Sequence, residues 1–187
     1  MSYITIDSST ASTTVIVFNE KLEIVKRFQK GHRQIITDEG YIEQDLEEIY
    51  QNLLELVKKA SEIKSNPKFI SLTNQRETFT LFNKKDGKPI HNAVVWQCTR
   101  GQKICEDILN DKSKNNEIMD KTGLKPNTFF SGSKLKWVYE NKSEVKSKID
   151  NGEILFGTIE TYLIYRLTNL NSYVTDTTNA SRTLLFN

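Results

Sequence analysis

The sequence has few of the residues that mark specialised classes of protein. Its 187 residues include only 2 Cys and 2 His, too few and too scattered for a disulfide scaffold or a zinc site. Only 3 Pro and 8 Gly exclude a collagen-like chain and a disordered chain rich in these residues. Cys98 and Cys105 are the only cysteines, and because a lone pair in a reducing compartment is usually unbridged, both are expected to be unbridged and structural.

Charge of one sign and long hydrophobic runs are also lacking. The 26 basic residues nearly balance the 24 acidic ones, so a net charge of +2 gives no reason to expect a nucleic acid or a membrane surface as partner. No segment approaches the ~18 continuous apolar residues of a membrane span. The first residues, 1–7, lack the basic start and apolar stretch of a signal peptide. We expect a cytoplasmic protein.

The composition is that of a folded protein, with 37% hydrophobic and 27% charged residues. β-Branched and aromatic residues dominate 3–7 and 14–18, and a third short run covers 22–25, which predicts a three-stranded antiparallel meander. After a polar loop, apolar residues at helical spacing predict an amphipathic helix over 45–63. Asp45 and Glu48 have the spacing of an N-cap and its third helical residue.

Strands and then helices fill the rest of the chain. We predict a buried strand at 69–72, and further strands at 78–83, 93–96 and 154–156, with a turn at 85–87. Helices are predicted near 99–110, 114–121, 133–141, 143–149 and 161–167. This order indicates a mixed α/β or α+β architecture. The length suits one domain.

The turn between the first two predicted strands, 7–14, consists almost entirely of small hydroxylated residues. Backbone N–H groups and hydroxyls there could close around a phosphate, while Asp7 at the strand end could hold a cation or orient a water. A Ser/Thr-rich hairpin without a ligand explains the same residues. From these residues alone, both readings stay open.

Two later clusters could bind a polyol. Arg76 and Glu77 follow a predicted strand at the end where open α/β sheets bind ligands, and together they offer donors and acceptors to neighbouring hydroxyls. Trp96 ends another apolar run, and its face could cover the carbon side of a polyol. The alternatives are a surface ion pair for the first cluster and a core tryptophan for the second. Trp137 is interpreted as packing.

In this order, five segments resemble the glycerol kinases of the FGGY carbohydrate kinase family. The resemblance spans essentially the whole chain and rests on 73–78 (TNQRET), 87–98 (GKPIHNAVVWQC), 130–134 (FSGSK), 155–158 (LFGT) and 175–187 (TDTTNASRTLLFN).

The resemblance implies an actin-like ATPase, or ribonuclease H-like, fold. It also implies ATP- and Mg²⁺-dependent phosphorylation of glycerol to sn-glycerol 3-phosphate in a cleft between two domains. Residues 1–187 would be a nearly complete first domain, and the second, nucleotide-binding domain would be absent.

The resemblance also assigns roles to individual residues. Arg76, Glu77, Trp96 and Phe129 would bind glycerol. The phosphates of ATP would face Thr10, Ala11, Ser12 and Thr14, and Asp7 would hold Mg²⁺ or orient a water. No residue of this chain corresponds to the family's catalytic base.

The chain departs from the family pattern at four positions in and around these residues. Ser9 and Ala11 stand where the family usually has Gly and Thr, and Thr14 replaces a basic residue, so a hydroxyl and a positive charge near the phosphates are lost. Phe129 replaces a tyrosine whose hydroxyl would contact glycerol, a hydrogen bond of about 1 kcal/mol.

We therefore expect the chain alone to be inactive, because phosphoryl transfer needs both walls of a cleft. A separately encoded second domain, or a homo-oligomer, is a candidate partner beside glycerol and ATP. Two alternatives stay open. The chain could be a non-catalytic polyol-binding remnant or module, or part of a kinase for another sugar or polyol of the same family.

Overall fold

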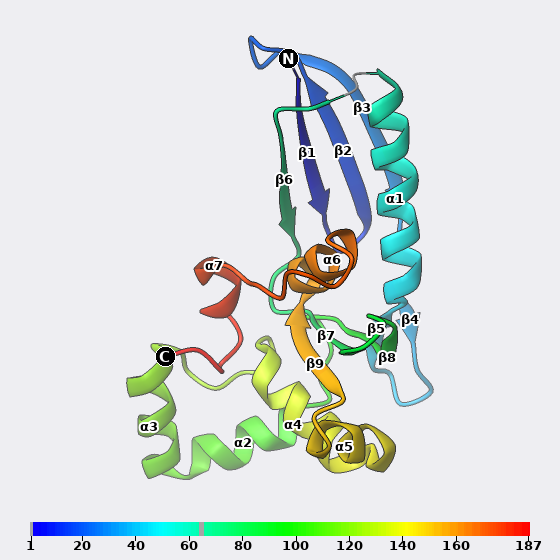
Figure 1. The fold of residues 1–187 in the computed structure, drawn as a ribbon. Helices are drawn as coiled ribbons and strands as arrows, with labels where there is room; N and C mark the ends of the chain where they lie inside the picture. The colour runs from blue at the N-terminus through cyan, green and yellow to red at the C-terminus, as the bar shows by residue number, and fades with distance from the viewer. Residues whose placement is uncertain (1, 64–65) are drawn as a thin grey trace. The chain divides into compact units, whose positions relative to one another are not determined.

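The computed structural model describes residues 2–63 and 66–187, and the chain divides into two compact units (Figure 1). Unit 1 comprises Met1–Gln34 and Gln44–Gln75, and unit 2 comprises Ile35–Glu43 and Arg76–Asn187. Each unit has its own sheet. Within the described residues no helix is long and apolar enough to cross a membrane.

Unit 1 is built on a four-stranded sheet in the order β3-β2-β1-β6. The predicted meander is confirmed, since β2 pairs antiparallel with both β1 and β3, and β6 then pairs parallel with β1. β3 extends six residues beyond the predicted end. The strands are β1 (Tyr3–Ser8), β2 (Ser12–Phe18), β3 (Ile24–Gly31) and β6 (Phe69–Asn74).

The helix α1 (Leu46–Ile63) lies along one face of this sheet (Figure 1). Asp45 accepts hydrogen bonds from the backbone N–H groups of Glu47 and Glu48, which confirms the predicted cap. Alternate residues of β1 and β2 face the apolar stripe of the helix, because side chains alternate along a strand. The buried set is Ile4, Ile6, Val15, Val17, Leu46, Ile49, Leu53, Leu56 and Ala60.

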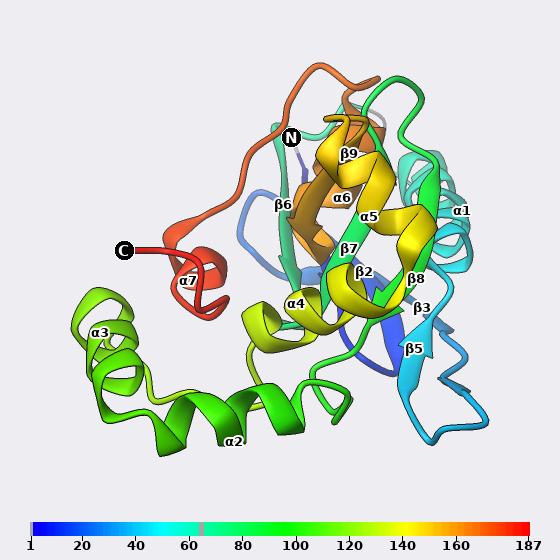
Figure 2. The same ribbon diagram turned by 90° about the horizontal axis from the view of Figure 1, so that it is seen from below.

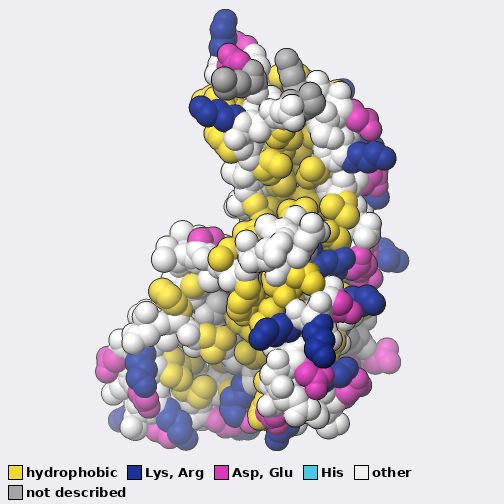
Figure 3. All heavy atoms as spheres, viewed as in Figure 1, with side chains coloured by type: hydrophobic (Ala, Val, Ile, Leu, Met, Phe, Trp, Pro, Cys, Tyr) yellow, Lys and Arg dark blue, Asp and Glu magenta, His cyan; other side chains and the backbone are white. Residues whose placement is uncertain are grey.

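The prediction that 69–72 form a buried strand is wrong about burial. β6 is an edge strand of its sheet, and Phe69 and Ile70 are 51% and 52% exposed. The apolar run is typical of a strand covered on both faces, but here the outer edge is open and both faces are partly exposed, because Phe69 and Ile70 lie on opposite faces. Figure 3 shows apolar side chains open to solvent on the sheet of unit 1. The rings of Tyr3 and Phe69 lie there with centroids 4.7 Å apart.

Unit 2 contains a five-stranded sheet in the order β4-β5-β8-β7-β9. β7 pairs antiparallel with β8 and with β9, and β4 with β5. β4 and β5 were not predicted because they are two and three residues long and lack apolar alternation. The strand predicted at 93–96 instead begins and ends earlier in the chain, as β8. The bounds are β4 (Ile35–Ile36), β5 (Ile42–Gln44), β7 (Phe79–Asn83), β8 (Pro89–Val94) and β9 (Ile154–Thr158).

Helices surround this second sheet. α5 and α6 pack against β9, whereas α2 and α3 continue away from the sheet beyond α4 (Figure 2). All five predicted helices form, and a short sixth, α7, was missed because it has a single turn. They are α2 (Gln102–Asn110), α3 (Lys112–Thr122), α4 (Ser131–Asn141), α5 (Ser143–Asp150), α6 (Ile159–Leu167) and α7 (Thr177–Ala180).

The core of unit 2 joins the sheet to α4 and α5. Both cysteines are buried and unbridged, as predicted. The mixed α/β architecture is likewise confirmed. The buried core cluster comprises Phe79, Leu81, Val94, Cys98, Val138 and Val145.

Candidate functional site

The predicted site residues fall into two groups that lie in different units. The turn between β1 and β2, together with the adjoining strand ends, spans residues 7–14 and lies in unit 1. Arg76, Glu77, Trp96 and Phe129 all lie in unit 2. After the roles that the sequence analysis expects for them, we call the first group the phosphate loop and the second the polyol cluster.

The phosphate loop is shaped mainly by bonds of its main chain. The N–H of Ser9 donates to the carbonyl of Ser12 at 2.9 Å and closes the turn. The carbonyl of Thr10 accepts from Gln44 Nε2 at 2.6 Å, and that of Ala11 accepts from the N–H of His32 at 2.9 Å. Since these carbonyls already have partners, the backbone path depends little on the side chains of the turn.

Three hydroxylated side chains lie around Asp7. Ser9 Oγ donates to Asp7 Oδ1 at 2.7 Å. Thr14 and Thr73 are the partners of Asp7 on the two neighbouring strands, so the side chains of Asp7, Thr14 and Thr73 project from the same face of the sheet. Asp7 is exposed and Thr14 is buried. Serine at the position where the family usually has Gly therefore contacts the carboxylate itself.

Whether these residues fit Mg²⁺ follows from the donor set. Within residues 2–63 and 66–187, no group of three His, Cys, Asp or Glu could hold a metal ion. Mg²⁺ bound with a nucleotide commonly uses only one or two carboxylates, with phosphates and waters as its other ligands. The exposed carboxylate of Asp7 fits that smaller role.

His32 supports the phosphate loop and was not predicted as a functional residue. Its Nε2 lies 3.0 Å from Thr13 Oγ1, and its Nδ1 lies 3.2 Å from Asn52 Nδ2. Burial lowers the pKa of His32, and the charge of Glu48 offsets part of this effect. No pattern in the sequence links these distant residues, so this support could not be predicted.

The polyol cluster is centred on Glu77, whose backbone φ is +63°. Its side chain is 7% exposed, and Oε1 accepts from Arg182 Nε at 2.7 Å. Its carbonyl accepts from Ser131 Oγ at 2.9 Å. A left-handed conformation is uncommon for a residue other than Gly, and such residues gather at binding sites. Arg76, beside it, is exposed.

Two aromatic rings lie in the same cluster. The centroids of Trp96 and Phe129 are 5.2 Å apart, and Phe129 also contacts Phe130 edge-on at 5.8 Å. The guanidinium of Arg182 lies 4.7 Å from the Phe130 centroid and 5.9 Å from that of Phe129. Arg182 therefore links Glu77 to the aromatic rings. It was identified in the sequence only as part of a family motif.

A lysine lies beneath these rings. Lys134 is fully buried, and its Nζ donates to the carbonyl of Phe129 at 2.9 Å and to that of Trp96 at 3.3 Å. Burial lowers the pKa of Lys134 to about 8. The sequence places it in a motif but gives no sign that it would be enclosed.

A second buried charge pair fixes the strand that leads to Trp96. Arg100 Nη2 lies 2.5 Å from Glu43 Oε1, and Asn92 Nδ2 donates to Glu43 Oε2 at 2.9 Å. Burial raises the pKa of Glu43, but the hydrogen bonds from Arg100 and Asn92 outweigh it and the pKa is lowered overall. Trp137 packs over the guanidinium of Arg100 at 5.2 Å, which confirms its structural role.

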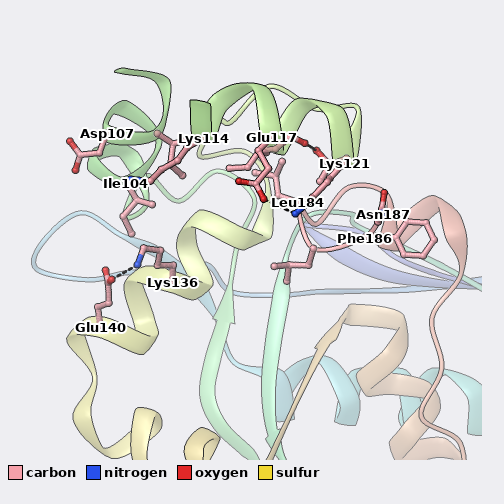
Figure 4. A pocket seen from close by; sticks show the side chains of 14 residues that line it. Ile104, Asp107, Lys114, Glu117, Lys121, Lys136, Glu140, Leu184, Phe186 and Asn187 are labelled. Carbon is pink, nitrogen blue, oxygen red and sulfur yellow. Dashed lines mark hydrogen bonds and ion pairs between the residues drawn. The ribbon is translucent and has the colours of Figure 1, made fainter. Parts of the chain in front are cut away.

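An open groove of about 700 Å³ lies elsewhere in unit 2 (Figure 4). Apolar residues of α2 and α3, such as Ile104 and Ile118, line it with the last four residues of the chain. Exposed ion pairs, Lys121–Glu117 and Lys136–Glu140, border it. None of the predicted site residues lines this groove.

Comparison with known proteins identifies the fold and its family. Residues 2–187 match the N-terminal domain of the FGGY family of carbohydrate kinases. The chain belongs to this family. It is 44% identical over 191 residues to glycerol kinase 1 of Thermotoga maritima, covering 100% of this chain and 39% of that protein.

Solved structures of FGGY kinases agree with this assignment. Plasmodium falciparum glycerol kinase with ADP has a TM-score of 0.90 and 39% identity, covering 98% of this chain and 37% of that one. Gluconate kinase from Lactobacillus acidophilus has a TM-score of 0.88 and 26% identity, covering 100% and 36%. The predicted actin-like ATPase fold is confirmed. The chain spans under two-fifths of these relatives, and that it forms a nearly complete first domain stays a prediction.

Proposed function

We propose that this FGGY chain is the polyol-binding part of a glycerol kinase. The observation that carries the proposal is the carboxylate of Glu77, which Arg182 holds in place beside the rings of Trp96 and Phe129. A fixed acceptor beside an apolar wall is the arrangement that a small polyol requires, since its hydroxyls need partners and its carbons need a nonpolar surface.

Each residue of the cluster would have a distinct part in binding. Glu77 would accept hydrogen bonds from one or two hydroxyls of glycerol, and the exposed guanidinium of Arg76 would donate to the oxygens. Trp96 would cover the carbon side. Phe129 would add apolar surface without the hydroxyl of a tyrosine. Together they would hold the acceptor hydroxyl in one orientation, which is the main contribution of a protein to phosphoryl transfer.

The phosphate loop would supply the nucleotide side of the reaction in a complete enzyme. Thr10, Ala11, Ser12 and Thr14 would face the phosphates of ATP, and Asp7 would hold Mg²⁺. The metal ion would neutralise charge on the phosphates. No base for the acceptor hydroxyl is assigned in this chain, so we propose that it does not phosphorylate glycerol alone.

A second candidate is a polyol-binding module without kinase activity. The lack of a basic residue in the phosphate loop favours it, because Thr14 stands where the family usually has a basic residue and Ala11 where it has a hydroxyl. A kinase for a different sugar receives less support, since identity is 44% to a glycerol kinase and 26% to a gluconate kinase.

Glycerol titration followed by calorimetry tests the binding step. We expect millimolar-range binding by this chain, and its loss in Arg76→Met and Glu77→Gln. Arg33→Met is the matched control, because Arg33 is an exposed arginine of unit 1 with 80% of its side chain accessible. Absence of binding by the parent chain even at high millimolar glycerol would show that the proposal is wrong.

An assay of glycerol-dependent ADP formation separates the two candidates. The chain alone should form no ADP, and a longer protein that includes this chain and a second domain should do so if it is a kinase. A longer protein that binds glycerol but forms no ADP would support the non-catalytic module instead.

A further inference from the structure

The first turn of α4 contacts every segment of the polyol cluster. Ser131 Oγ donates to the carbonyl of Glu77, and the N–H of Gly132 donates to the carbonyl of Thr183, next to Arg182. Lys134, three residues after Ser131 and on the same side of the helix, donates to two further carbonyls. This turn therefore joins segments that are far apart in the sequence.

Lys134 stands out because it is charged and fully enclosed. Removing an ammonium group from water is unfavourable unless its N–H groups have partners. Its two partners are the carbonyls of Trp96 and Phe129, 38 and 5 residues away in the sequence. These are the residues whose rings meet at 5.2 Å. One amine thus connects the main chains that carry both rings.

We propose that Lys134 is a positioning residue, which sets the spacing of Trp96 and Phe129 by holding both main-chain carbonyls and thereby tunes the affinity for a polyol. The effect on affinity rests on the proposed function, whereas the effect on the two main chains does not. Lys134 itself contacts the carbonyls and acts on the ligand only through the rings.

The surroundings of Lys134 make its charge titratable under accessible conditions. Its pKa is lowered to about 8, mainly by burial and in part by the nearby charge of Arg100, while Cys98, Glu77 and Cys105 act in the opposite direction. Below this pH the ammonium offers three N–H donors, and charged donors form the stronger hydrogen bonds. Above it the neutral amine offers two weaker donors, so both carbonyl contacts should loosen.

Backbone amide spectra of the unmodified chain test the two contacts directly. The N–H groups of Gln97 and Phe130 belong to the same peptide units as the carbonyls of Trp96 and Phe129. We expect both amide nitrogen resonances to titrate together between about pH 6 and about pH 10, with a shared midpoint near the lysine pKa. Lys134→Met should abolish this titration, whereas Lys136→Met, an exposed lysine of the same helix, should retain it.

The thiols of Cys98 and Cys105 also lie near Lys134, and burial raises the pKa of Cys105. They remain in Lys134→Met, so a titration that survives in this variant belongs to them. That outcome, or independent behaviour of Gln97 and Phe130, would overturn the proposal. Should Lys134→Met not fold, Lys134→Arg is compared with the parent instead. An arginine stays charged, so the amides of Gln97 and Phe130 should not titrate in that variant.

Glycerol titration of the same variants tests the effect on affinity. We expect Lys134→Met to weaken binding by about tenfold or more, and Lys136→Met to change it by less than about twofold. If Lys134→Met bound glycerol as tightly as the parent, the proposed effect of Lys134 on polyol affinity would be wrong, and the proposed function would stay intact. If the parent binds no glycerol, the proposed function fails, and the amide titration still decides whether Lys134 holds the two carbonyls.

Discussion

The phosphate loop of unit 1 and the polyol cluster of unit 2 are held together by different kinds of interaction. The loop depends on main-chain carbonyls that accept from Gln44 and from the N–H of His32. The cluster depends on buried or half-buried charges, Glu77 with Arg182 and the enclosed Lys134. One region is shaped by its backbone and the other by its side chains.

This difference teaches which region can change without losing its shape. A turn closed by main-chain bonds accepts new side chains, and the loop departs from its family at Ser9, Ala11 and Thr14 while keeping the turn. A cluster held by buried charges cannot lose one partner without leaving the other unpaired. Arg76, Glu77 and Trp96 match the family, and among the four residues that we propose to bind substrate the departure is the uncharged Phe129.

The largest effect is expected from the buried pair of unit 2. Glu43→Ala would leave Arg100, 1% exposed, without its carboxylate and should lower the free energy of unfolding by about 3–5 kcal/mol. Denaturant unfolding followed by tryptophan fluorescence reports unit 2, because Trp96 and Trp137 both lie there.

Glu117→Ala is the control for this variant, since Glu117 pairs with Lys121 on the surface with 61% of each side chain exposed. Because water screens this exposed pair, the substitution should lower the free energy of unfolding far less than Glu43→Ala does. Equal effects of the two substitutions would remove the distinction between buried and exposed charge on which the comparison rests.

The next effect is a dependence of stability on pH. The pKa of Lys134 is lowered to about 8 in the folded chain, from an ordinary value near 10.5. Between these two pH values the unfolded chain binds more protons than the folded chain, so the contribution of Lys134 to the free energy of unfolding rises with pH. It is lower below about pH 8 than above pH 10.5 by roughly 3 kcal/mol.

The contribution is measured as the difference between the parent and Lys134→Met in denaturant unfolding at a series of pH values. Other titrating groups are common to both chains and largely cancel. A difference that stays constant between about pH 8 and pH 10.5 would show that Lys134 has an ordinary pKa. The contrast between the two regions would then no longer rest on this lysine.

The sequence could predict most of the fold because local patterns determine it. The spacing of apolar residues in α1 and the cap at Asp45 were sufficient for that helix. Burial of β6 was predicted wrongly, because a run such as 69–72 does not reveal whether another element covers it. β4 was missed because two residues carry no periodicity.

Cooperation between residues of the candidate site could be predicted only where they are adjacent in the sequence. Arg76 and Glu77 are neighbours, so their chemistry was visible. Arg182 reaches Glu77 across 105 residues, and Lys134 reaches Trp96 across 38, so only the folded chain brings them together. No composition or spacing rule connects such pairs.

A smaller effect is expected at the ion pair of the polyol cluster. Arg182→Met removes the partner of Glu77, but 31% of the arginine side chain is exposed and water can partly replace it. We expect a loss of about 2 kcal/mol in the unfolding of unit 2 and weaker glycerol binding. The double variant with Glu77→Gln should cost less than the sum of the two single changes. Strict additivity would mean that the pair contributes nothing as a pair.

The smallest effect is expected in the phosphate loop. Ala11 is exposed, and only its carbonyl is tied, by the N–H of His32. Ala11→Thr restores the hydroxyl usual in the family and should change stability by less than about 0.5 kcal/mol. Amide hydrogen exchange of β1 and β2 is the suitable measurement, because no tryptophan lies in unit 1. A loss as large as that of Arg182→Met would mean that side chains also shape the loop, so its departures from the family would then have changed its structure as well as its chemistry.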